Sequence, residues 1–381
     1  MALAPAPLFA TSMAYFGLLI VAVLFVIHLL RGGWRDLRPN PLDLPLAVFL
    51  LLRILSTLTS VDPALSWKGL EKSGLLLAFY PLAHMPLRPA RRWAGIYIFL
   101  AATVAAAAAG IGMFALGEVE RISSPTGGYT TFAQILAVAL CFLAAAAVLY
   151  SGRRRLGLAA AAVLPFGALI LTFCRGQWLA LVAGVGVIGA LHNRRVWAVV
   201  LVIAAAAAAA AYLLPAGVAS GRFTLGDPAF ENYRDILWKG ALEIVFDRPL
   251  TGFGPETIKV VFPYQTRFYS PVAGVIGWHN DYLRLVIESG VLAAAAAMWI
   301  VVAAVASAGR AYRRGASAGV RGLGLGLLAA TAAVLVSGLV GDVISDPAML
   351  VLFVVLWGLA LPLMAEPAAA RNGNRELTDS A

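Results

Sequence analysis

Three polar side chains stand out in a chain that is otherwise mostly apolar: Arg175, Arg234 and His279. The guanidinium group of arginine binds phosphate oxygens through two parallel hydrogen bonds. The imidazole of histidine has an ordinary pKa of about 6.5, so it exchanges protons near neutral pH. Two arginines and one histidine therefore suit a reaction in which a diphosphate is neutralised and a proton is removed from an attacking hydroxyl group.

His279 lies in the run Trp278-His279-Asn280-Asp281 at the start of an apolar segment, with Glu288 further along the same predicted helix. Two interpretations of Asp281 remain open, because its carboxylate can orient the imidazole or interact with the helix N-terminus. The other three histidines lie at the ends of apolar runs, where interfacial packing explains them: His28, His84 and His192.

Each arginine also has a purely structural interpretation. Arg175 can serve as an interfacial anchor beside Trp178, although the positive-inside rule makes an arginine on the outer face uncommon and favours contact with an anion. Arg234 can be a solvated surface charge, or it can pair with Glu231 or Asp235. The residue types alone do not separate these interpretations.

Two further positions are candidates for substrate binding. Arg53 lies in the middle of an apolar run, where it can line a polar cavity or extend its side chain to the nearer interface. Gly254 belongs to the segment 247–256, whose two prolines and two glycines predict a tight, shaped turn. The chain has no Asp-x-Asp, Walker or H-E-x-x-H motif, and its two cysteines form no metal-ligand pattern, so no metal and no cofactor are predicted.

The elements that must position these residues are membrane spans. The chain of 381 residues is 61% hydrophobic and only 13% charged, a composition typical of a polytopic membrane protein. A spanning helix needs about 17–25 mostly apolar residues. The candidate spans are 8–30, 42–60, 69–87, 94–117, 131–150, 156–174, 176–191, 196–215, 283–308, 321–341 and 348–365. The sequence therefore predicts an all-α polytopic membrane protein with about 11–12 transmembrane helices.

The distribution of basic residues predicts how the spans are oriented. Arginines occur in alternate connections, which the positive-inside rule assigns to the cytoplasm. Residues 1–215 then form about eight N-terminal spans, 216–282 a large periplasmic loop, 283–365 three C-terminal spans and 366–381 a disordered cytoplasmic tail. The net charge of +10 is thus an orientation signal, and its dispersal along membrane edges argues against nucleic-acid binding.

The large loop contains one segment with helical periodicity. Apolar side chains recur at Tyr233, Leu237, Ala241 and Val245, with charged residues on the other faces. This pattern predicts an amphipathic helix that lies on the membrane surface or on the bundle.

These motifs together resemble the bacterial O-antigen ligase and polymerase superfamily. The resemblance rests on the run from Trp278 to Gly290, preceded by Asp247-x-Pro249-x-x-Gly252-x-Gly254-Pro255. It extends to Cys174-Arg175-Gly176, to Tyr233-Arg234 with Trp238, and to the segment 56–66 with Asp62-Pro63. It covers most of the chain but does not distinguish a ligase from a polymerase.

The resemblance implies a substrate class and roles for particular residues. The donor would be a glycan on undecaprenyl diphosphate at the periplasmic face of the bacterial inner membrane, and the acceptor a lipid A–core sugar or another envelope glycan. Arg175 and Arg234 would hold the donor diphosphate, while His279 would activate or orient the acceptor hydroxyl. Arg53, Gly254, Asn280 and Asp281 are the remaining substrate-binding candidates. The transfer would be inverting and independent of metal.

Two features depart from the superfamily pattern. Only one clear span precedes Arg31, and Cys174 occupies the position where serine or threonine is usual. The main alternative is a polymerase that joins glycan repeat units with the same donor chemistry. A lipid or glycan transporter is less favoured, because the sequence shows no internal repeat and its polar residues gather at one face.

Overall fold

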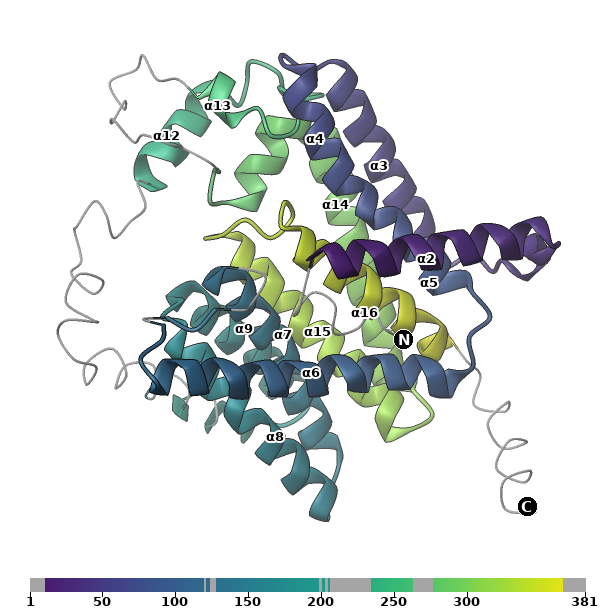
Figure 1. The fold of residues 1–381 in the computed structure, drawn as a ribbon, viewed down its shortest axis with the longest axis vertical. Coiled ribbons are helices and arrows are strands. Elements are labelled where there is room, and N and C mark those ends of the chain that lie inside the picture. The colour runs from purple at the N-terminus through teal and green to yellow at the C-terminus, as the bar shows by residue number, and fades with distance from the viewer. Residues whose placement is uncertain are drawn as a thin grey trace.

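The computed structural model describes residues 11–119, 121–123, 128–198, 201–202, 205, 234–262 and 277–365. Within these residues every regular element is a helix and no strand is present (Figure 1). The predicted all-α class is therefore confirmed. Three sequence-based predictions lie largely or wholly outside the described residues: the span 196–215, much of the loop 216–282 with Tyr233 and Glu231, and the tail 366–381.

The helices follow one another along the chain with short connections. They are α2 (Thr11–Leu30), η1 (Gly33–Asp36), α3 (Asp43–Leu58), α4 (Pro63–Gly74), η2 (Leu75–Ala78), α5 (Phe79–His84), α6 (Pro89–Ala115), α7 (Tyr129–Leu149), α8 (Gly152–Leu171), α9 (Arg175–Leu191), α12 (Arg234–Ile244), α13 (Ile258–Val261), α14 (Asp281–Arg314), α15 (Ala318–Gly338) and α16 (Pro347–Ala365). Among the described residues, six helices are long and apolar enough to cross a membrane: α6, α7, α8, α14, α15 and α16. The protein is thus a multi-pass membrane protein.

The predicted spans agree with these helices except at a few ends. The largest difference concerns the predicted span 69–87, because the helical run there begins already at Pro63 and continues through α4, η2 and α5. Asp62 caps this run by accepting a hydrogen bond of 3.0 Å from the backbone N–H of Leu65. Most of the connection predicted at 61–68 is therefore helical.

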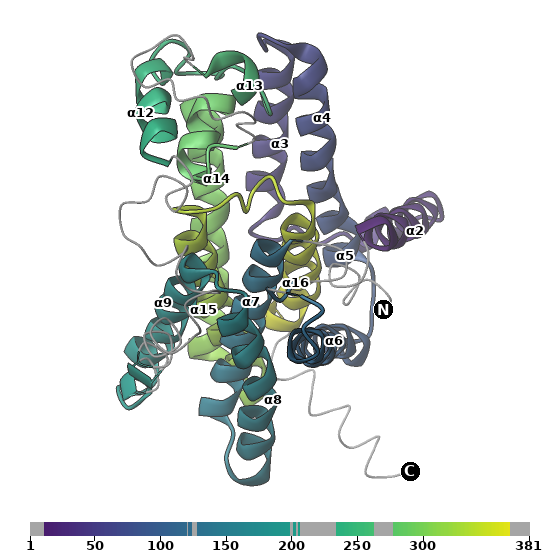
Figure 2. The ribbon, with the colours of Figure 1, turned by 60° about the vertical axis from the view of Figure 1, so that its left-hand side comes forward.

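The long helix α14 organises the bundle (Figure 1). It packs against α3 on one side and against α15 on the other, and α15 in turn packs against α7 and α9. Helix α6 runs crosswise, since it is seen along its length in Figure 1 and nearly end-on in Figure 2, whereas α14 is upright in both. The bundle thus contains both steeply inclined and crossing helices.

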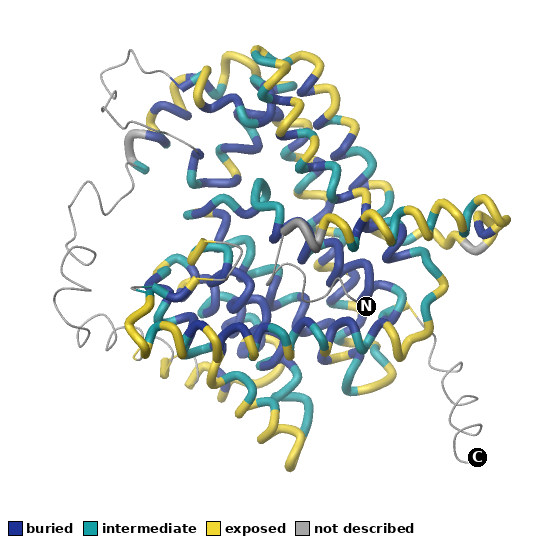
Figure 3. The backbone as a smooth tube through the Cα atoms, in the orientation of Figure 1, coloured by how far each residue is buried: buried dark blue, intermediate teal, exposed yellow. Residues whose placement is uncertain are grey.

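The buried core lies in α7, α15 and α16 (Figure 3). Its fully buried side chains include Leu136, Leu325 and Val351. Helices at the periphery instead expose large apolar side chains, such as Phe16 on α2 and Val163 on α8. Exposed apolar surface of this kind suits contact with lipid acyl chains.

Helix α14 is interrupted at Gly290, whose φ of 77° and ψ of 172° are not helical. A Cβ at this position would lie 2.1 Å from a carbonyl oxygen of the turn 249–256, so only glycine fits. At the interruption the carbonyl oxygen of Glu288 accepts hydrogen bonds from Gly254 N at 2.9 Å and from Ser56 Oγ at 2.7 Å. The turn is therefore attached to both α14 and α3.

The charge pattern assigns successive connections to opposite sides of the membrane. In the structure these connections lie at opposite ends of the four packed helices α7, α9, α14 and α15. At one end Gln134 and Gln177 both donate hydrogen bonds to Ser337, at 3.2 and 2.7 Å. At the other end His192 lies 3.2 Å from the hydroxyl of Tyr312. Which end faces the cytoplasm stays a prediction.

Candidate active site

His279 immediately precedes α14. The helix is capped by Asn280, whose Oδ1 accepts hydrogen bonds from the backbone N–H groups of Tyr282 and Leu283 at 3.0 and 3.1 Å. His279 has a positive φ of 50°, a backbone conformation in which histidine is enriched relative to most residues. In this conformation its Nδ1 lies 2.9 Å from Oδ2 of Asp342, in the loop between α15 and α16.

Asp342 determines how the imidazole is protonated. Burial alone would raise the pKa of Asp342, but the hydrogen bond from His279 and the charge of Arg284, 3.2 Å away, outweigh burial and hold this pKa below its ordinary value. An ionised carboxylate accepts the proton of Nδ1, which leaves the lone pair on Nε2. His279 can therefore accept a proton at Nε2 from a hydroxyl group.

Asp281 positions the α15–α16 loop (residues 339–346) rather than the imidazole. Its carboxylate accepts hydrogen bonds from the backbone N–H groups of Val343 at 2.8 Å and of Ile344 at 3.2 Å. Asn280 caps the helix and Asp342 is the partner of the imidazole, so the role of Asp281 in the site is indirect. It fixes the backbone on which Asp342 is carried.

The same loop contacts Arg234 and the residue after Arg175. Arg234, the first residue of α12, donates from Nη2 to the carbonyl oxygen of Val340 at 2.8 Å. Gly176 at the start of α9 also packs against Val340, since a Cβ there would lie 2.6 Å from its Cγ2. Arg175, which is exposed, and Arg234, which is half-buried, are thereby brought to one short segment.

A third arginine joins this group and was not singled out from the sequence. Arg121 donates from Nη2 to the carbonyl oxygen of Phe173 at 3.4 Å, and its guanidinium carbon lies 4.0 Å from the centre of the Tyr129 ring. The charges of Arg234 and Arg121 both act on Arg175. Arg121 lies in the connection 118–130, which the charge pattern assigns to the outer face of the membrane. The positive-inside argument that favours contact of Arg175 with an anion therefore applies to Arg121 as well.

Arg121, Arg175 and Arg234 form a like-charge group, called here the arginine cluster. Burial lowers the pKa of Arg234, an effect that the negative charge of Asp342 partly offsets. Within the described part of the chain, the buried Nε atoms of Arg121 and Arg234 have no hydrogen-bond partner. Like charges held together repel one another, so this arrangement favours an anion with several acceptor oxygens, as in a diphosphate.

Arg53 and Gly254, the other two candidates, are enclosed by the protein. The Arg53 side chain is buried and donates to Ser289 Oγ at 2.6 Å and to Ser73 Oγ at 3.2 Å, so it does not extend to the interface. Gly254 has a φ of 111°, and a Cβ there would lie 2.1 Å from Ser60 Oγ. Their described contacts join α3, α4 and the turn 249–256 to α14. Contact of either residue with substrate stays a prediction.

A second charged group lies near the interruption of α14. Arg284 Nε is 3.2 Å from Glu288 Oε1, and Glu288 Oε2 accepts a hydrogen bond of 3.0 Å from the backbone N–H of Glu256. Lys72 Nζ reaches Glu256 Oε1 at 3.0 Å. These four residues form the paired network, in which positive and negative side chains alternate. Asp342 connects it to His279 through Arg284.

Three residues other than glycine have a positive φ within the described part of the chain: Phe173, Glu256 and His279. Each borders the site. Phe173 accepts the hydrogen bond of Arg121, Glu256 belongs to the paired network, and His279 contacts Asp342. Backbone strain of this kind occurs at functional sites, where the surrounding structure enforces it.

Residues 160–298 match the family model described as O-antigen ligase. This match supports membership of the O-antigen ligase superfamily. The superfamily assignment supports glycosyltransferase-like activity of the ligase or polymerase type on lipid-linked glycans in general. The matched segment contains Arg175, Arg234 and His279, whereas Arg121 and Asp342 lie outside it. No curated protein matches the chain.

Proposed function

We propose that the protein is an O-antigen ligase-type glycosyltransferase. It moves a glycan from undecaprenyl diphosphate to a sugar hydroxyl of lipid A–core or of a related envelope acceptor. One observation supports this proposal above the others: His279 and Arg234, the latter from the arginine cluster, both contact the 339–346 loop, at Asp342 and Val340. The residue proposed to accept the proton and one of those proposed to bind the anion thus share one short segment.

The proposed reaction is a single displacement. The acceptor hydroxyl attacks the anomeric carbon, a new glycosidic C–O bond forms, and the bond to the diphosphate oxygen breaks with inversion of configuration. The hydroxyl proton passes to Nε2 of His279, and Asp342 stabilises the imidazolium that results.

The leaving undecaprenyl diphosphate carries the electron pair away as negative charge on oxygen. Arg121, Arg175 and Arg234 supply the positive charge that stabilises it, so we propose that the transfer is independent of metal. Removing one such preorganised contact typically costs about 2.7–4 kcal/mol of transition-state stabilisation.

The proposed location follows from the donor. A polyprenyl chain must stay in the bilayer while its diphosphate reaches the site, so the site lies at a membrane face. The charge pattern assigns this face to the periplasm, and we propose the bacterial inner membrane as the location.

The test is glycan transfer from a lipid-linked donor by the purified chain. We expect His279→Ala, Arg175→Ala and Arg234→Ala each to lower the rate by about 10²–10³-fold. His192→Ala is the matched control, because His192 lies at the opposite end of the bundle beside Tyr312 and should leave transfer unchanged. Near-normal transfer by correctly inserted His279→Ala would remove His279 from the mechanism.

Polymerisation of glycan repeat units remains the second candidate, because the family assignment covers both reactions. The two differ only in the acceptor, which for a polymerase is a second lipid-linked glycan. Supplying each acceptor separately to the purified chain discriminates between them. Longer lipid-linked products without lipid A–core would identify a polymerase.

A further inference from the structure

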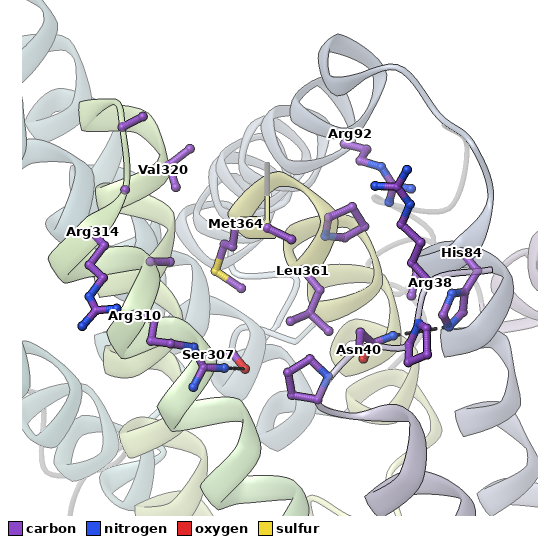
Figure 4. A pocket seen from close by; sticks show the side chains of 18 of the residues that line it. Arg38, Asn40, His84, Arg92, Ser307, Arg310, Arg314, Val320, Leu361 and Met364 are labelled. Carbon is purple, nitrogen blue, oxygen red and sulfur yellow. Dashed lines mark hydrogen bonds between the residues drawn. The ribbon is translucent and has the colours of Figure 1, made fainter. Parts of the chain in front are cut away.

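A cavity of about 610 Å³ lies at the end of the bundle opposite the candidate active site (Figure 4). Its walls come from the end of α14, the ends of α5 and α16, the start of α6, and the segment 38–41. Figure 4 shows Arg310 and Arg314 on one wall and Arg38 and Arg92 on the other, with Leu361 and Met364 between them. The cavity thus has two basic walls and an apolar floor.

The charged side chains that line this cavity are basic. Its lining includes four arginines, and no aspartate or glutamate lines it within the described residues. Asp43, next to the lining residue His84, is engaged by His84 Nε2 at 2.9 Å and by the amide of Asn40 at 2.6 Å. The cavity therefore attracts an anion.

The basic walls are held in place by hydrogen bonds to the protein. Arg92 is buried and donates to the backbone carbonyl oxygens of Leu82, Met85 and Gly358. Arg310 donates to Ser307 Oγ at 3.2 Å. Arg38 and Arg314 are exposed, and neither makes a hydrogen bond or ion pair with another described side chain. Arg92 is thus fixed, whereas Arg310, oriented by one hydrogen bond, and the exposed Arg38 and Arg314 can bind a ligand.

The volume and the apolar floor indicate a ligand larger than an inorganic ion. Cavities of about 300–1,000 Å³ accommodate molecules of some tens of atoms. Leu361, Met364 and Val320 provide an apolar surface directly beside the arginines. Helix ends of a membrane protein lie where phospholipid headgroups meet acyl chains, and basic cavities between such ends bind anionic headgroups.

We propose that this cavity binds an anionic phospholipid, whose phosphate lies among Arg38, Arg310 and Arg314 and whose first acyl carbons lie on Leu361 and Met364. The lipid neutralises the arginines and joins the ends of α14 and α16 to the segment before α3. This site is independent of the proposed transfer reaction.

The test measures thermal stability of the delipidated full chain in neutral detergent after addition of phosphatidylglycerol, phosphatidylcholine or inorganic phosphate. We compare Arg310→Gln/Arg314→Gln with Arg153→Gln/Arg155→Gln. The second pair removes the same charge from exposed positions on α8 that do not line the cavity. A further variant, Arg310→Lys/Arg314→Lys, keeps the charge and loses the planar guanidinium groups.

We expect phosphatidylglycerol to raise the Tm of the wild type and of the α8 variant in a saturable manner, and phosphatidylcholine to have no such effect. The apparent affinity of Arg310→Gln/Arg314→Gln for phosphatidylglycerol should fall by at least about tenfold relative to the wild type, and the affinity of the lysine variant should fall by less. Equal responses of the two glutamine variants would overturn the proposal in favour of diffuse surface charge. An equal response to inorganic phosphate would assign the cavity to a small anion, and no response to phosphatidylglycerol would also overturn the proposal.

Discussion

The arginine cluster and the paired network contain the same side-chain type in opposite surroundings. Arg284 of the network lies between Glu288 at 3.2 Å and Asp342 at 3.2 Å. In the cluster, Arg175 instead experiences the positive charges of Arg121 and Arg234. An arginine surrounded by carboxylates has its charge neutralised within the protein, whereas a group of arginines is ready to bind an external anion. The comparison therefore separates arginines that hold the fold from arginines proposed to bind substrate.

Asp342 contacts Arg284 of the paired network and its charge acts on Arg234 of the arginine cluster, so its replacement should have the largest effect. Asp342→Asn keeps the size of the side chain but removes the charge that fixes the Nδ1–H tautomer of His279. We expect the transfer rate to fall by about 10²–10⁴-fold, the range of a general-base contribution. The measurement is the rate at several donor concentrations, which separates kcat from KM. A change in KM alone would show that Asp342 serves donor binding instead of proton transfer.

In the paired network the effect should appear in stability. Glu288→Met removes the carboxylate 3.2 Å from the buried Arg284 guanidinium, and loss of one partner of a buried ion pair costs about 3–5 kcal/mol. Thermal unfolding in detergent measures the change. The double variant Arg284→Met/Glu288→Met removes both charges, so it should lose less stability than the sum of the single variants. Additive losses would contradict the pairing.

In the arginine cluster the effect should appear in activity, and stability should be retained. Arg121→Gln is expected to lower transfer by about 10–100-fold, the value of one charge-assisted hydrogen bond, with little change in Tm, because relief of the repulsion offsets loss of the contacts with Phe173 and Tyr129. Arg248→Gln is the control, since Arg248 is exposed and donates to the carbonyl oxygen of Thr59 outside the cluster. A lower Tm with an unchanged transfer rate would show that Arg121 stabilises the fold and does not act on the donor.

The smallest effect is expected from pH. The pKa of Asp342 is held below its ordinary value, about 3.9 for aspartate. Its ionised form therefore contributes stability that is fully present above about pH 4–5 and is lost as the pH falls through the lower pKa of the folded state. The Tm difference between the wild type and Asp342→Asn should be constant from neutral pH to about pH 5 and decrease below it. A difference that already changes between neutral pH and pH 5 would contradict the assignment to Asp342.

The sequence predicts the helices well, because long apolar runs and proline or glycine boundaries are local signals. It also indicates Arg175, Arg234 and His279, since polar residues are conspicuous in an apolar chain. Their association with the α15–α16 loop is not local. Asp342 lies 63 positions after His279 and was predicted only as part of a short connection. No periodicity or spacing connects these two residues.

Asp281 and Arg53 illustrate the same limit. The sequence leaves open whether Asp281 orients the imidazole of His279 or interacts with the helix N-terminus, whereas in the structure the imidazole contacts Asp342 and His279 has a left-handed backbone. Arg53 was unexplained as a charge in an apolar run, because its partner Ser289 is 236 positions away. In both cases tertiary packing decides which polar groups meet.

The interruption of α14 at Gly290 has a consequence for the order in which the chain is assembled. Ser56 finds its acceptor, the carbonyl oxygen of Glu288, only 232 residues later, and Ser60 finds that of Phe253 193 residues later. The ribosome therefore delivers α3 and α4 to the membrane long before the groups that complete them. Truncation of the chain before Phe253 would therefore leave both of these hydroxyl groups without their acceptors.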